Sequence, residues 1–124
     1  MATFRDLLKQ ADNRTTDHGT NISGNITLNV SDSLLHKLTI VGNTTIFTQG
    51  WINNEISELV IEIRQGGLYS VTWNNTIGWI DFNGNLITSL AALGRILNSD
   101  PNVPDFIMLW STDGGATIFG KVLR

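Results

Sequence analysis

From residue 22 onward the chain alternates apolar and polar side chains with a period of two. The clearest run is 57–65 (SELVIEIRQ), in which Leu59, Ile61 and Ile63 share one face and the intervening residues share the other. A period of two places successive side chains on opposite faces of an extended strand, whereas a helix needs a period of 3.6. The sequence therefore predicts an all-β body.

Glycine-containing turns divide the alternating runs into short strands. Gly42-Asn43 separates 38–41 from 44–48, Gly66-Gly67 precedes 68–73, and residues 112–115 (TDGG) separate 106–110 from 116–123. Each of these turns is predicted to close a hairpin. Leucines recur at helical spacing over residues 86–97, which favours a brief helix there. Many short strands with frequent turns predict a β-sandwich or jelly roll.

The N-terminal segment has a different pattern. Phe4, Leu7, Leu8 and Ala11 follow the spacing i, i+3, i+4, i+7, which predicts a short amphipathic helix, and residues 12–21 contain no apolar side chain. An isolated helix shorter than about 12 residues is marginal in water, so its apolar stripe needs a surface to lie on. We therefore predict two units, a helix and linker arm over 1–21 and a β-sandwich domain over 22–124. The surface belongs either to a partner or to the chain's own body.

Composition excludes several classes of function. Charged residues make up only 15% of the 124, the formal net charge is -3, and Lys and Arg do not cluster. A nucleic-acid groove would therefore lack its electrostatic basis. No segment has the roughly 20 apolar residues that span a bilayer, so we expect no membrane partner. Asn (13) and Thr (14) supply most of the polar surface, and the absence of Cys excludes disulfides and thiol chemistry.

The residues that could carry catalysis are few. His18 falls in the predicted linker and His36 on a strand, and neither has a plausible partner in the sequence. The Asp residues near turns are explained by turn formation, and no GxSxG, HExxH or phosphate-binding glycine loop occurs. A small carbohydrate-active enzyme would need two carboxylates in a cleft, which the sequence does not supply. We predict no enzyme activity, no cofactor and no metal site.

One tryptophan stands out as a candidate for recognition. Trp51 follows Gly50 and precedes Ile52, Asn53 and Asn54 in a predicted loop. An exposed indole stacks on the apolar face of a sugar, and amides hydrogen-bond its hydroxyls. Together with Asn74, these residues form a candidate loop for a glycan or a protein partner, although tryptophan in a small sandwich more often belongs to the core.

The two most specific stretches are 71–79 (VTWNNTIGW) and 111–120 (STDGGATIFG), and three supporting runs are 24–30, 38–48 and 59–65. With these stretches the chain resembles a β-sandwich module of virion proteins from tailed bacteriophages, which occurs in tail fibres and in capsid decoration (cement) proteins. The resemblance implies a structural role in a phage particle, commonly as a homotrimer, without catalytic residues.

The arm and the resemblance together lead to one expectation of function. The chain is expected to be a trimeric decoration protein on the outer capsid surface of the virion, made in the host cytoplasm, that binds the major capsid protein through its arm. Phe4, Leu7 and Leu8 would anchor the arm, and Arg5 and Lys9 would pair with acidic groups on the capsid. Three weak arms on one trimer attach tightly through effective concentration. The alternative is a tail-fibre or receptor-binding module that contacts host-surface glycans.

Overall fold

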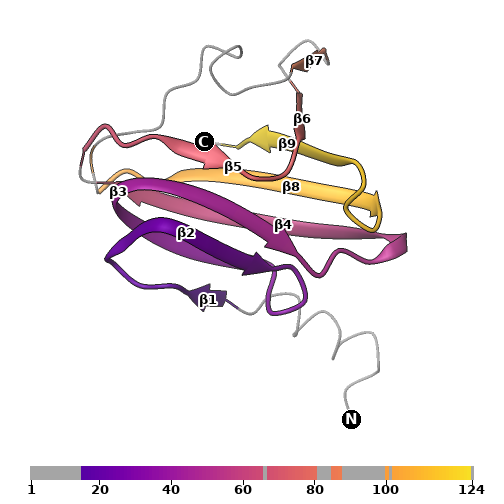
Figure 1. Ribbon diagram of the computed structural model, residues 1–124, viewed down its shortest axis with the longest axis horizontal. Coiled ribbons are helices and arrows are strands. Elements are labelled where there is room, and N and C mark those ends of the chain that lie inside the picture. Colours follow the sequence, from indigo (N-terminus) through magenta and orange to yellow (C-terminus); the bar gives the residue numbers. More distant parts are fainter. Residues whose placement is uncertain (1–14, 66, 81–84, 88–99, 101, 124) are drawn as a thin grey trace.

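The computed structural model describes residues 15–65, 67–80, 85–87, 100 and 102–123 (Figure 1). The helix predicted within residues 3–11 lies outside these ranges, as does most of the leucine-spaced segment 86–97. Of that segment, residues 86 and 87 form a strand rather than a helical turn.

Nine strands make up the described part of the chain. In order they are β1 (Thr15–Asp17), β2 (Ile22–Asn29), β3 (Leu35–Gln49), β4 (Asn53–Gln65), β5 (Val71–Trp73), β6 (Ile77–Ile80), β7 (Leu86–Ile87), β8 (Asp105–Asp113) and β9 (Ile118–Val122). All nine belong to one hydrogen-bonded sheet of mixed direction, in the order β1-β3-β4-β8-β9-β6-β7, with β2 and β5 also paired to β3. The all-β prediction is confirmed.

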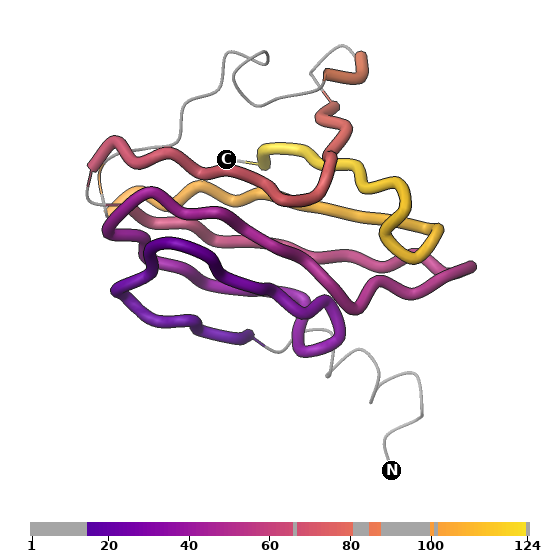
Figure 2. The backbone as a smooth tube through the Cα atoms, in the orientation of Figure 1, coloured from indigo at the N-terminus to yellow at the C-terminus, as the bar shows by residue number. Residues whose placement is uncertain are grey.

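The long strand β3 organises this sheet. Its first part, residues 35–40, pairs in parallel with β1 on one side and with the end of β4 on the other. Its second part, residues 44–49, pairs in parallel with β2, and residues 44–46 pair with β5. Residues 41–43 lie between the two parts, where the chain turns back on itself (Figure 2).

These parallel pairings stack the chain in three tiers. In the first tier the chain runs along β1, turns and returns along β2, and β3 repeats the same course in the second tier (Figure 2). The end of β4 and β5 form the third tier. Residues in equivalent places stack, so that Leu35 pairs with both Thr15 and Val60, and Thr44 pairs with both Gly24 and Val71. Such stacking of successive turns of chain is the arrangement of a short β-solenoid.

The tiers correct two of the predicted hairpins. Gly42 and Asn43 lie inside the continuous strand β3, so the predicted hairpin at this point is wrong. The hairpin predicted at 66–67 is also wrong, because β4 and β5 each pair with β3 rather than with each other. The third, between β8 and β9, is confirmed by their antiparallel pairing. The strands of a β-sandwich or jelly roll pair antiparallel, whereas the tiers described above pair in parallel. The direction of these pairings therefore differs from the one predicted from the turns.

Each tier consists of two runs of chain. The first run is β1, the first part of β3 or the end of β4, and the second run is β2, the second part of β3 or β5. The core lies between these two runs. Leu28 and Ile46 from the second runs and Leu38 and Ile63 from the first belong to one buried cluster, because the bend of each tier brings the two runs face to face. The antiparallel part of the sheet completes the cluster with Ile107, Leu109, Ile118, Ile77 and Trp79. Each of these side chains stabilises the fold by about 1.5–3 kcal/mol through its burial.

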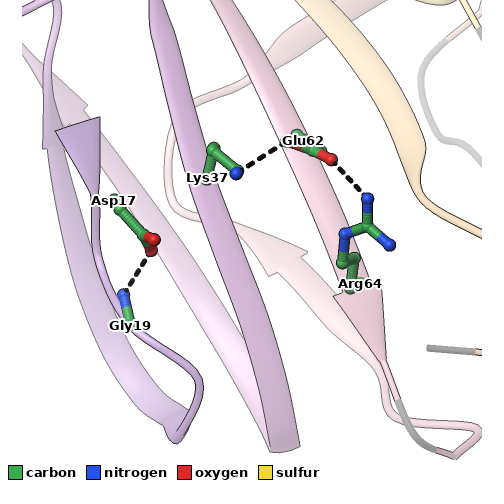
Figure 3. A network of polar contacts seen from close by, with 5 residues as sticks. All are labelled: Asp17, Gly19, Lys37, Glu62 and Arg64. Atoms are coloured by element: carbon green, nitrogen blue, oxygen red, sulfur yellow. Dashed lines mark hydrogen bonds and ion pairs between the residues drawn. The ribbon is translucent and has the colours of Figure 1, made fainter. Parts of the chain in front are cut away.

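A ladder of charges follows the stacking on the outside of the first runs. Asp17, Lys37 and Glu62 occupy consecutive tiers in register. Glu62 Oε1 accepts a hydrogen bond from Arg64 at 2.9 Å, and Glu62 Oε2 lies 3.9 Å from Lys37 Nζ (Figure 3). Opposite charges in neighbouring strands favour this register over a slipped one. Residue 17 thus sits in the sheet, although it falls within the predicted arm.

Candidate functional site

The predicted recognition loop lies at one end of the sheet, between β3 and β4. Trp51 is half-buried there, and its indole Nε1 donates a hydrogen bond of 3.0 Å to Thr48 Oγ1. Thr48 in turn donates to Asn75 Oδ1, from its hydroxyl at 2.8 Å and from its backbone N–H at 3.1 Å. Asn75 follows β5, so these bonds join the Trp51 loop to the segment that contains Asn74.

The turn between β8 and β9 lies against the Trp51 side chain. The buried Ser111 hydroxyl shapes this turn, because it donates to Asp113 Oδ1 at 2.9 Å and accepts the Gly115 N–H at 3.0 Å. A Cβ atom on Gly115 would lie only 2.6 Å from Trp51 Cδ1. The absence of a side chain at Gly115 therefore lets the indole ring rest against the turn.

A second buried serine fixes the other side of the loop. Ser57 Oγ accepts the Ile52 N–H at 3.0 Å, and Ser57 pairs with Ser111 in the register of β4 and β8. In the same register Asn53 pairs with Asp113. Asn54 adopts a positive φ of 62°, in the left-handed region that asparagine tolerates better than most residues. Two facing serines thus hold the loop and the turn together.

We call the set Trp51, Asn53, Asn54, Asn74, Asn75 and Asp113 the Trp51 surface. Asp113 is its charged member, and hydrogen bonds from the backbone N–H and the side chain of Thr117 and from Ser111 lower the pKa of its carboxyl below the ordinary value. Asp113 therefore stays ionised under mildly acidic conditions. A half-exposed indole, several amides and one carboxylate can bind a sugar or a polar protein segment by stacking and hydrogen bonding.

Apolar side chains lie beside this surface. Ile52 is 48% exposed and Ile56 is 63% exposed, and both belong to the same loop and strand as Asn53 and Asn54. Two large exposed aliphatic side chains next to a half-exposed tryptophan resemble the apolar centre of a protein interface more than a sugar subsite. Among the described residues, no group of three potential metal ligands occurs.

The structure brings together most of the predicted loop residues. Trp51 lies closer to the body than predicted, since it is half-buried and hydrogen-bonded. Asn74 is exposed, and its backbone N–H donates to Ile46 O at 2.9 Å, while its neighbour Asn75 makes the side-chain contact. Thr48, Asn75 and Gly115 were not predicted from the sequence. The only local signals were the pairs Asn74-Asn75 and Gly114-Gly115. The predicted arm residues Phe4, Arg5, Leu7, Leu8 and Lys9 lie outside the described part of the chain.

The expectation that the two histidines have no partner is wrong. His18 Nε2 lies 2.8 Å from His36 Nδ1, and His36 is fully buried. The register of β1 on β3, which pairs Asp17 with Lys37, brings the two rings together.

Comparisons with protein-family models, with curated proteins and with solved structures find no match to this chain. Within the residues that the structure describes, no helix is long and apolar enough to span a membrane.

Proposed function

We propose that this protein is a structural protein of a bacteriophage virion, and that it is a trimeric decoration (cement) protein on the outer surface of the capsid. The observation that carries the proposal is the Trp51 surface together with the exposed Ile52 and Ile56. Buried serines and the Trp51–Thr48–Asn75 hydrogen bonds hold these groups in place before any partner binds, which lowers the entropic cost of association.

The two stretches that carry the phage resemblance support the same proposal, because both contribute to this surface. Residues 71–79 supply Asn74 and Asn75, and residues 111–120 supply Asp113 as well as Gly115, against which the Trp51 ring lies. The segments that resemble virion modules therefore form the surface that is best suited to binding, rather than only the core.

In the proposed mechanism, the body forms the trimer and the arm attaches it to the major capsid protein. Phe4, Leu7 and Leu8 pack on the capsid subunit, while Arg5 and Lys9 pair with its acidic groups. Residue 14 leads directly into β1, so tension on the arm is carried by the pairing of β1 with β3. Three arms per trimer multiply weak single contacts into stable attachment.

The test is removal of residues 1–14 from the chain. We expect the shortened protein to keep the β-sheet circular dichroism spectrum and the trimeric mass of the full chain, and to lose co-sedimentation with capsids. A double substitution, L7D with L8D, should have the same effect without shortening the chain. Co-sedimentation of both variants at the level of the full chain would contradict the proposed role of the arm.

The alternative, a tail-fibre or receptor-binding module, is favoured by one specific observation. Trp51 presents a half-exposed indole beside amide side chains, the combination that stacks on and hydrogen-bonds to sugars. Labelling of intact virions distinguishes the two locations. Many copies over the head support the decoration protein, whereas label confined to the tail tip supports the fibre module.

A further inference from the structure

The histidine pair joins the first tier to the second by a single hydrogen bond between imidazole rings. His18 comes directly after β1, and His36 lies in the first part of β3. The ring planes differ by 15° and the ring centroids are 5.1 Å apart, while the facing nitrogens are only 2.8 Å apart. Because the nitrogens lie between the two centroids, the rings meet end to end and not face to face.

This geometry sets how many protons the pair can hold. When both rings are neutral, one of the facing nitrogens carries a hydrogen and the other accepts it. A first added proton can go to the outer nitrogen of His18, Nδ1, and leave the N–H···N bond intact. A second proton would place hydrogens on both facing nitrogens, so the hydrogen bond would be lost and two like charges would meet.

The surroundings of the pair favour the neutral state. Desolvation is the largest cause that lowers the pKa of both rings below the ordinary value, and the charge of His18 further lowers that of His36. Asp17 and Asp32 are the charged groups that act on the pair. Together with the backbone hydrogen bonds of Ser33 and Asn29 to His36, they raise the pKa values and so oppose this shift only in part. On β4 the residue that pairs with His36 is the apolar Ile61, while Lys37 and Glu62 lie on the opposite face of their strands.

The remaining polar contacts of the pair are neutral. Ser33 Oγ lies 3.5 Å from His36 Nε2 and 2.7 Å from Thr16 Oγ1, so a second side-chain contact between β1 and the following tier lies beside the histidines. Neither hydroxyl changes charge in the range in which histidine titrates.

We propose that the His18–His36 pair is a two-proton latch, which holds the first run of the first tier against β3 when both rings are neutral and loosens it in acid. The latch matters because β1 is short and lies at the edge of the sheet. Within the described ranges it pairs through three residues, and its one partner there is β3. Outside the strand pairing itself, two backbone hydrogen bonds flank the latch among the described residues, from His18 N–H to Lys37 O and from Thr39 N–H to Gly19 O.

Opening of the latch would free residues 15–21 from the sheet while β2 remains paired with β3. At about 3.3 Å per extended residue, these seven residues lengthen the segment that precedes β2 by about 23 Å. The latch thus gives the segment that precedes β2 two maximum lengths, a shorter one at neutral pH and a longer one in acid. This device is a property of the fold and does not depend on the proposed role in a virion.

The test is amide hydrogen exchange in the full chain between pH 7 and pH 4.5, corrected for the intrinsic pH dependence of exchange. The amides of His18 and Thr39 report opening of β1, because their hydrogen bonds flank the latch. As the pH falls, the equilibrium constant for opening of β1 should rise by about tenfold per pH unit where opening takes up one proton, and more steeply where it takes up two. The core amides of β8 should keep their protection over the same range.

Two variants separate the latch from ordinary loosening of an edge strand. H18Q keeps an amide N–H that can donate to His36 and removes one titrating group, so opening can take up at most one proton and its constant should rise by no more than about tenfold per pH unit as the pH falls. The matched control T16V removes the Thr16–Ser33 contact of the same strand without a titrating group, and should increase opening by the same factor at every pH.

The wild-type protein alone also provides a decisive measurement. The side-chain nitrogen resonances of His18 and His36 should titrate in two coupled steps below the ordinary pKa of histidine. Two independent titrations at the ordinary value, or the same pH dependence of opening in H18Q and the wild type, would overturn the proposal.

Discussion

Gly115 and Gly114 allow a sharp test of how the Trp51 surface is held. The two glycines are adjacent and both have positive φ, 89° and 71°, so alanine is strained at either position. They differ in what a side chain would meet. A Cβ on Gly115 would lie 2.6 Å from Trp51 Cδ1 and 2.9 Å from Cγ, whereas a Cβ on Gly114 has its nearest neighbour at 3.5 Å, the Cβ of Asn53.

The magnitudes follow from this difference. Both alanine variants lose about 1–2 kcal/mol of unfolding free energy to the left-handed conformation. G115A must in addition either compress the indole, at about 1–3 kcal/mol, or let Trp51 swing away. In the second case the hydrogen bond to Thr48 is lost, at about 1 kcal/mol, together with part of the burial of the ring. Since the ring is half-buried and takes the cheaper route, we expect G115A to be about 1–2 kcal/mol less stable than G114A.

The assay combines urea unfolding with the indole N–H resonance of Trp51. G114A should keep the wild-type resonance, while in G115A it should move toward the position of a solvent-exposed indole and exchange faster with water. If the two variants are equally stable and the Trp51 resonance is unchanged in both, the contact between Trp51 and the turn does not hold the surface, and this account of the site is wrong.

Two further predictions concern the body. Alanine at Gly120 would place a Cβ 2.6 Å and 2.7 Å from ring atoms of the buried Trp79, so G120A should lose about 1–3 kcal/mol of unfolding free energy. In urea unfolding, the double variant with W79F should lose less than the sum of the losses of the two single variants. Replacement of Glu62 by Gln removes the charge that Arg64 and Lys37 contact; because both cations are partly exposed, E62Q should lose only about 0.5–1 kcal/mol, a loss that shrinks when unfolding is measured in 1 M salt.

The sequence was sufficient to predict the class of the fold and one face of its core. Leu59, Ile61 and Ile63, placed together by their alternation, are all buried in β4. Alternation depends only on which side chains face the core, so it is the same in a parallel tier and in an antiparallel hairpin. For this reason Gly42-Asn43 was compatible with a tight hairpin as well as with the bend that the structure shows within β3.

The site could be predicted only in part, for a related reason. Trp51 and its neighbours are contiguous in the sequence and carry a local signal. The contact of Thr48 with Asn75 spans 27 positions, and the contact of His18 with His36 spans 18. Both contacts arise from the register between tiers, which is set by the whole stack and not by the residues that meet. The apparent isolation of His18 in a polar stretch was therefore misleading.

Asn29 lies close to both the latch and the Trp51 surface. The strand pairings decide whether opening of the latch also changes that surface. Asn29 contacts both sides: its backbone hydrogen-bonds to His36, and its Oδ1 lies against Gly50, which precedes Trp51. Asn29 belongs to β2, which pairs with β3 through seven residues, whereas β1 pairs through three. The longer pairing should keep Asn29 in place when protons open the latch. The Trp51 indole resonance should therefore stay constant over the pH range in which β1 opens; a shift with the same midpoint would mean that acid reshapes the binding surface as well as the N-terminal segment.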